Sequence, residues 1–134
     1  MRLRVISEAA WKIVAVVDDR GDCEVLDALD ELASNKKTSA TASGFRAWWE
    51  HIPPEGPRQL PDSVYHCVDA ENEIWEFIKG RHRILCFQTA GRIVVCSHVM
   101  LKASQKTPAK EKKRAIALRT EFLESLSQGG VRYE

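Results

Sequence analysis

The chain has 134 residues, of which 44% are hydrophobic and 29% charged, and its formal net charge is +1. This length predicts a single domain over residues 1–134 that buries enough apolar surface to fold without disulfides or metals. No apolar run approaches the roughly 20 residues of a membrane-spanning helix, and the first residues lack the pattern of a signal peptide. We therefore expect a cytoplasmic protein without a membrane partner.

The near-neutral net charge hides a strong polarity along the chain. Residues 79–114 contain ten Lys and Arg and one acidic residue, Glu111, which gives this segment a net charge of +9. Residues 1–78 carry a net charge of −7, which leaves room for a basic partner at the acidic part of the chain. A local positive field of this size attracts polyanions whatever the overall charge, so the basic segment predicts nucleic-acid binding.

The first half of the chain predicts one strand and one or two helices. Residues 11–17, WKIVAVV, are rich in β-branched side chains and predict the first strand. Apolar residues recur at helical spacing over residues 23–33, which predicts a helix with Asp22 as its N-cap. Residues 35–52 are ambiguous, because the helical spacing of their aromatic residues is opposed by Gly44.

The second half of the chain predicts a sheet followed by a helix. Four strands joined by short turns are expected, which implies an antiparallel meander; they are residues 64–68, 73–79, 81–88 and 92–101. A polar loop leads into a last helix with Thr107 as N-cap and Pro108 at the first helical position. The predicted fold class is therefore α+β: an antiparallel or mixed sheet of four to five strands, N-terminal helices and a C-terminal helix.

The four cysteines form no CxxC pair, so we interpret them as free thiols. A metal site can be imagined from two short pairings, but neither has the spacing of known zinc sites; the residues would be His66, Cys67, Cys96 and His98. We expect no metal and no other cofactor.

A more specific pattern lies in residues 74–122. A strand with Arg83 before an apolar run is followed by a strand that ends near His98. A lysine-rich segment then leads into the last helix; its matching residues are Lys102, Ser104, Lys106, Thr107 and Pro108. This succession resembles the phage-derived HigB-like branch of the RelE-like toxin superfamily, and the order of elements in the whole chain resembles the RelE-like fold. Two positions depart from the family pattern, namely Ala103 for a second lysine and Val99–Met100 for a Gly-Phe pair.

The resemblance implies the toxin of a type II toxin–antitoxin system, a ribosome-dependent messenger RNA endonuclease. The implied partners are messenger RNA on the ribosome and a small helix-turn-helix antitoxin of the HigA-like kind, through which the toxin forms an oligomer.

The residues themselves fit metal-independent RNA cleavage, in which the 2′-hydroxyl attacks its own phosphate. We expect Arg83 to stabilise the charge on phosphorus, and His98 or Lys102 to transfer protons. His98 and Lys102 are four residues apart, so an extended strand would place both on one face. Arg81, Lys79 and Lys106 are expected to bind RNA phosphates or the ribosome. Glu76 is a base, an orienting partner for Arg83, or half of an ordinary cross-strand ion pair. His98, taken alone on an apolar strand, would more often be a core histidine with satisfied hydrogen bonds.

Two other readings stay open at this point. In the first, which Ala103 favours, the chain keeps the fold and binds RNA, ribosome or antitoxin but has lost catalysis. In the second, it is a phage accessory or structural protein that uses the fold for protein contacts.

Overall fold

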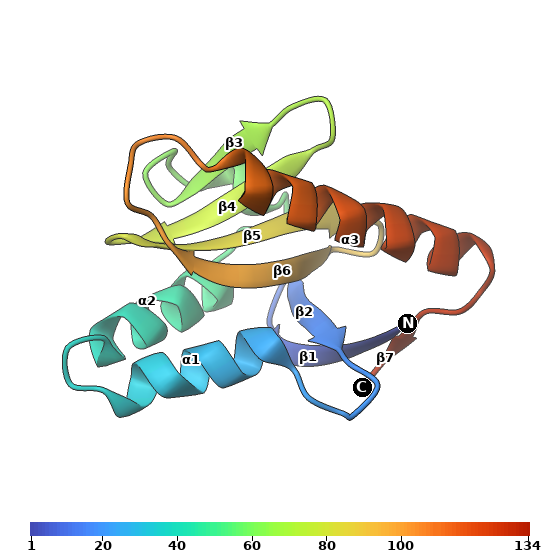
Figure 1. Ribbon diagram of the computed structural model, residues 1–134, viewed down its shortest axis with the longest axis horizontal. Helices are drawn as coiled ribbons and strands as arrows, with labels where there is room; N and C mark the ends of the chain where they lie inside the picture. Colours follow the sequence, from blue (N-terminus) through green and yellow to red (C-terminus); the bar gives the residue numbers. More distant parts are fainter.

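The computed structural model describes residues 1–134 as an α+β fold with three helices and a seven-stranded sheet (Figure 1). The helices are α1 (Glu24–Ser34), α2 (Ser39–Glu50) and α3 (Ala109–Ser127), and a short 3₁₀ helix spans Pro57–Gln59. The strands are β1 (Arg2–Glu8), β2 (Lys12–Val17), β3 (Tyr65–Asp69), β4 (Ile74–Lys79), β5 (His82–Thr89), β6 (Ile93–Leu101) and β7 (Arg132–Tyr133). None of the helices is both long enough and apolar enough to span a bilayer.

The strands form one mixed sheet in the order β3-β4-β5-β6-β2-β1-β7. The predicted meander is confirmed, because β3 to β6 pair antiparallel in sequence order. Strand β6 lies at the centre of the sheet, where it pairs with β5 on one side and runs parallel to β2 on the other. Apolar residues on both faces of β6 fit this central position, because both of its faces are covered.

The prediction of four to five strands is wrong, because β1 and β7 add two strands beyond β2. The segment over residues 11–17 is therefore the second strand, and it pairs antiparallel with β1. The two-residue β7 runs parallel to β1 and is held by backbone bonds, including Glu134 N to Leu3 O at 2.8 Å. This pairing joins the two ends of the chain, so no local pattern could have revealed it.

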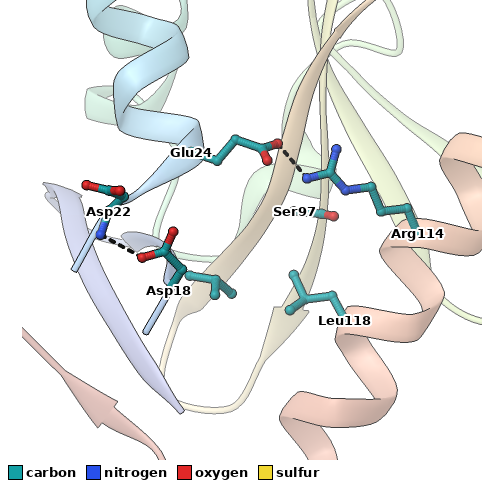
Figure 2. Close-up of a pocket in the computed structure, with 7 residues that line it drawn as sticks. Asp18, Asp22, Glu24, Ser97, Arg114 and Leu118 are labelled. Carbon is teal, nitrogen blue, oxygen red and sulfur yellow. Dashed lines mark hydrogen bonds and ion pairs between the residues drawn. The ribbon is translucent and has the colours of Figure 1, made fainter. Parts of the chain in front are cut away.

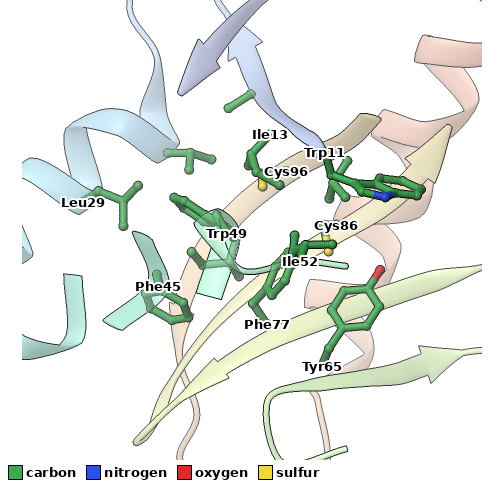
Figure 3. Close-up of a cluster of buried hydrophobic side chains, with 14 of the residues drawn as sticks. Trp11, Ile13, Leu29, Phe45, Trp49, Ile52, Tyr65, Phe77, Cys86 and Cys96 are labelled. Carbon is green, nitrogen blue, oxygen red and sulfur yellow. The ribbon is translucent and has the colours of Figure 1, made fainter. Parts of the chain in front are cut away.

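Helices cover both faces of the sheet, α1 and α2 on one and α3 on the other (Figure 1). Under α1 and α2 lies a cluster of 16 buried residues that includes Phe45, Trp49 and Phe77 (Figure 3). A second cluster of nine buried residues, among them Phe87 and Phe122, lies under α3. We call these the α1/α2 face and the α3 face of the sheet.

The ambiguous segment over residues 35–52 forms α2, and Gly44 has a packing role within it. A Cβ atom at Gly44 would lie only 2.6 Å from Cε of Lys79, so the missing side chain lets the Lys79 stem cross the helix closely. The close approach of α2 to the sheet explains why a residue that weakens helices is tolerated there.

Both predicted N-caps are wrong. Helix α1 begins after Cys23 and no side chain caps it, while Asp22 uses its backbone N–H to bond with the Asp18 carboxylate at 2.9 Å. Helix α3 begins after Pro108, also without a side-chain cap. The hydroxyl of Thr107 instead donates to Glu76 at 3.1 Å, which draws this residue into the sheet. In both cases a tertiary contact or a turn competes with the local cap.

Candidate functional site

A buried carboxylate, Glu76 on β4, is the centre of the polar cluster on the α3 face. Its side chain is fully buried, and its Oε1 lies 3.4 Å from Lys102 Nζ and 3.5 Å from Arg83 Nε. Its other oxygen, Oε2, accepts the hydrogen bond from the Thr107 hydroxyl. Because a buried charge needs partners of opposite sign, Glu76 brings two cations from β5 and the end of β6 together at one point.

The Arg83 guanidinium is anchored by the turn between β4 and β5. Its Nη1 donates to the carbonyl oxygens of Gly80, at 2.7 Å, and His82, at 3.0 Å. Gly80 has a φ of 58°, a conformation that favours glycine and lets its carbonyl meet Arg83. The Nη2 group makes no hydrogen bond within the protein, and Arg83 lines an open cleft. Arg83 is thus fixed in place while part of its guanidinium stays available to an anion.

Two adjoining hollows of about 340 and 490 Å³ flank the loop after β6, and they share Lys102 and Gln105. We call them together the basic cleft. No acidic residue lines either hollow, whereas five cationic residues do: Arg81, Arg83, Lys102, Lys106 and Lys112. Glu76 lies beneath this lining and offsets one positive charge, so the cleft keeps a strong positive field suited to a phosphate chain.

His66 on β3 also lines the basic cleft, although the sequence pattern pointed to it only as a member of an unsupported metal site. It pairs across the strands with Glu76, so the two side chains share the α3 face. Its side chain is exposed, in contrast to that of His98. Finding it required the register of β3 and β4, which contains an irregularity between Cys67 and Asp69.

His98 lies on the same face but outside the Glu76 cluster. Leu85 pairs with Glu76 on one side and with His98 on the other, and so separates them. The ring of His98 is buried, with Nε2 at 2.7 Å from Glu111 on α3 and Nδ1 at 2.8 Å from the hydroxyl of Ser97. Both ring nitrogens are therefore engaged inside the protein. His98 and Lys102 share a face, as their spacing predicts, but the structure does not bring them together.

The hydrogen bond between Ser97 and His98 depends on a bulge in β6. Cys96 pairs with Cys86 and His98 with Leu85, so Ser97 is an extra residue between them. Ser97 also lines a small cavity of about 190 Å³ between β2, α1 and α3 (Figure 2). An ion pair between Arg114 and Glu24 spans this cavity and links α3 to α1. It draws Arg114 away from the basic cleft.

Burial makes the pKa of His98 lower than its ordinary value of 6.5; Arg114 acts in the same direction, and the hydrogen bond to Glu111 opposes both. The folded state therefore disfavours the protonated ring. The contribution of His98 to the free energy of unfolding should be fully present above pH 6.5 and should be lost as the pH drops towards the folded pKa. Burial likewise lowers the pKa of His82, next to Arg81 and Arg83, so this residue adds to the same trend.

We expect the free energy of unfolding of His98→Gln to depend less on pH than that of the wild type between about pH 7.5 and about pH 5.5. Urea unfolding at the two pH values measures this difference, with the exposed His51→Gln as control. An unchanged pH dependence in His98→Gln would contradict the assignment of His98 as a neutral buried ring.

The remaining predicted residues divide between the two faces. Arg81, in the turn before β5, and Lys106, in the loop before α3, both line the basic cleft. Lys79 belongs to the α1/α2 face, where its stem packs over Gly44. The structure therefore brings Arg81, Arg83, Lys102 and Lys106 together and leaves Lys79 apart.

The imagined metal site is not assembled, because no group of three or more His, Cys, Asp or Glu side chains is placed to hold a metal ion. Cys96 is fully buried on the α1/α2 face, whereas His66 and Cys67 line the basic cleft. Burial raises the pKa of the Cys86 and Cys96 thiols, which makes both poor metal ligands.

The mixed sheet with helices on both faces places the protein in the α+β class and is compatible with an α+β toxin fold. Residues 50–120, more than half of the chain, match the model of the family described as "Phage derived protein Gp49-like (DUF891)", and the chain belongs to this family. The family is part of the RelE/HigB toxin-like superfamily and is a toxin family of toxin–antitoxin systems. Among curated proteins, none matches the chain.

The expected superfamily is therefore confirmed, and the narrower HigB-like branch stays a prediction. The matched residues contain β3 to β6 and the first part of α3, and with them Glu76, Arg83 and Lys102.

Proposed function

We propose that the protein is the toxin of a type II toxin–antitoxin system and cleaves messenger RNA on the ribosome without a metal ion. The observation that carries this proposal is the basic cleft, in which a buried Glu76 holds Arg83 and Lys102 beneath a lining of cations. Membership of a toxin family supports the toxin role.

In the proposed reaction the 2′-oxygen forms a bond to phosphorus, and the bond from phosphorus to the 5′-oxygen breaks. The proton of the 2′-hydroxyl passes to a base, and the departing 5′-oxygen receives a proton, which leaves a cyclic phosphate and a 5′-hydroxyl. Arg83, fixed by Glu76 and the Gly80 carbonyl, stabilises the charge that develops on the phosphate oxygens.

Proton transfer is assigned to Lys102, just after β6, and to His66 on β3, which line the same hollow. An imidazole suits this task because one ring nitrogen can accept a proton while the other donates one. His98 has both nitrogens engaged, so its part in the proposal is to hold Glu111 and thereby seat the start of α3 next to the cleft.

The outer cations position the substrate. Arg81 and Lys106 lie at the two ends of the basic cleft and contact phosphates on either side of the cleaved bond. Lys79, on the opposite face, is left as a contact to the ribosome. Activity on translated message places the protein in the cytoplasm, and the toxin role implies an antitoxin partner, which we expect to be a helix-turn-helix protein.

The test is primer extension on a translated message, with and without ribosomes. Arg83→Ala and Lys102→Ala should each reduce cleavage about 100-fold, because the first removes a charge aimed at the transition state and the second removes a proton-transfer group. Lys36→Ala, which removes an exposed cation between α1 and α2, should cleave like the wild type.

Cleavage that persists in both variants would place the active site elsewhere. No cleavage by the folded wild-type protein would favour the non-catalytic reading, in which the same cleft only grips RNA or ribosome. His66→Ala tests the proton-transfer role of His66, since it should reduce cleavage while leaving RNA binding close to that of the wild type.

A further inference from the structure

A groove on the α1/α2 face is the strongest feature that the proposed function leaves unused. One wall is the outer side of α1, with Ala28 and Leu32, and the other is the end of β6, with Val99 and Leu101. The hollow measures about 320 Å³, and most of its lining residues are apolar. Leu101 is 56% exposed, more than any other large hydrophobic residue of the protein. An apolar side chain left this open at a hollow is typical of a protein contact.

The groove continues along α1 and becomes acidic. A second hollow of about 370 Å³ shares Ala28 and Glu31 with the first and extends towards the loop after β2. Its lining contains one cation, Arg20, and five carboxylates: Asp18, Asp22, Glu24, Asp27 and Glu31. We call the two hollows together the α1 groove. It is apolar at the end near Leu101 and negative at the other end.

The charges on α1 are not balanced within the protein. The helix has four acidic residues and no basic one. Glu24 forms an ion pair with Arg114, whereas Asp27, Asp30 and Glu31 are exposed and have no ion-pair partner. Asp27 and Glu31 are four residues apart on one side of the helix, where like charges repel and destabilise it. This arrangement lowers the stability of the free protein and would be relieved by a cationic partner.

We infer that the α1 groove is the docking site for a basic amphipathic helix of a partner protein. An apolar side chain of that helix would bind next to Leu101, and its Lys or Arg residues would meet Asp27 and Glu31. Helix α1 has 11 residues and is about 16 Å long, which matches a partner segment of about three turns. In the context of the proposed function this partner is the antitoxin, an assignment that rests on that proposal.

The position of the α1 groove has a consequence for how such a partner acts. Helix α1 covers one face of the sheet and α3 covers the other (Figure 1). Glu76, which holds Arg83 and Lys102 at the basic cleft, lies on the α3 face. The apolar end of the α1 groove, at His82 and Leu101, adjoins Arg81 and Lys102 of the basic cleft, so a helix bound there would lie next to the proposed RNA site.

The test uses the full-length protein and a fluorescein-labelled helical peptide with leucine on one face and lysine on the other, followed by fluorescence anisotropy. The double variant Asp27→Lys/Glu31→Lys and the single variant Leu101→Asp should each weaken binding at least about tenfold. The matched controls on α3, Glu121→Lys/Glu124→Lys and Leu126→Asp, should bind like the wild type, because they alter exposed residues of the same kinds outside the groove.

A stability measurement on the same variants separates docking from misfolding. The urea midpoint of Asp27→Lys/Glu31→Lys should stay close to that of the wild type, since both residues are exposed and the pair again carries like charges. Loss of affinity together with this midpoint supports the inference. Absence of wild-type binding, equal weakening by the α3 controls, or equal binding of a peptide with glutamate in place of lysine would overturn it.

Peptide binding needs neither RNA nor ribosomes, so its outcome is independent of the cleavage assay. The double variant should still cleave message like the wild type, because Asp27 and Glu31 lie outside the basic cleft. If the wild type does not cleave but the binding pattern holds, the docking site stands and the proposed function fails.

Discussion

Replacing Glu76 with alanine should lower the free energy of unfolding by about 4 kcal/mol. The carboxylate is fully buried, and the side chains of Lys102 and Arg83 that it balances are only 10% and 15% exposed. Its removal leaves two poorly hydrated cations close together without a counter-charge, and it also leaves the buried Thr107 hydroxyl without its acceptor. Urea unfolding measures the loss.

Two further variants identify the cause of this effect. Glu76→Gln keeps an oxygen for Thr107 but loses the charge, so we expect an intermediate cost of about 2 kcal/mol. Glu73→Gln is the control, since Glu73 pairs with Arg119 at the surface, where an ion pair contributes less than about 1 kcal/mol. A Glu76→Ala protein as stable as the Glu73→Gln protein would show that Glu76 does not hold the cluster together.

Replacing Glu76 should also affect the binding of RNA at the basic cleft. With Glu76 gone, Arg83 and Lys102 keep their charges but lose the group that fixes their positions. We therefore expect Glu76→Gln to bind RNA at least as tightly as the wild type, because one negative charge is removed from beneath the basic cleft.

Trp49→Ala is the second substitution with a large expected effect, about 4 kcal/mol of unfolding free energy. Trp49 is fully buried between α2 and the sheet, stacked on Phe45 at 6.3 Å between ring centroids and edge-on to Phe77 at 6.1 Å (Figure 3). Alanine would leave a large cavity where three aromatic rings meet. Chemical unfolding of the variant measures the cost.

The neighbouring tryptophan provides a matched comparison. Trp48 is half-buried, so Trp48→Ala should cost about 1–2 kcal/mol. Trp49→Phe should cost less than about 1.5 kcal/mol, because the indole N–H of Trp49 has no hydrogen-bond partner and phenylalanine loses none. Equal costs for the two alanine variants would contradict the burial of Trp49 in the core.

The meander was predictable because its signals are local. Alternating polar and apolar residues and short turns placed β3 to β6 within about one residue of their observed ends, and α3 followed from its apolar spacing. The parallel pairing of β2 with β6, and of β7 with β1, joins segments far apart in the chain. Such pairings depend on long-range packing, which no local pattern reports.

The candidate site was predictable in its cations and not in its geometry. The charge polarity and the family pattern selected Arg83, Lys102 and Lys106, which line the basic cleft. His66 was not predicted as a residue of the RNA site, because its proximity to Glu76 depends on the strand register. Lys79 could have been excluded from this cleft, because it is three residues after Glu76 and side-chain alternation along a strand places the two on opposite faces.

Residue types and short spacings were enough to predict the α+β class, the meander, the polarity of charge and the pattern shared with a toxin superfamily. They did not predict that Glu76 gathers Arg83 and Lys102, that a bulge at Ser97 directs His98 to Glu111, or that the acids of α1 border an apolar groove. Each of these depends on strand register or helix packing, which bring together groups that the chain keeps apart.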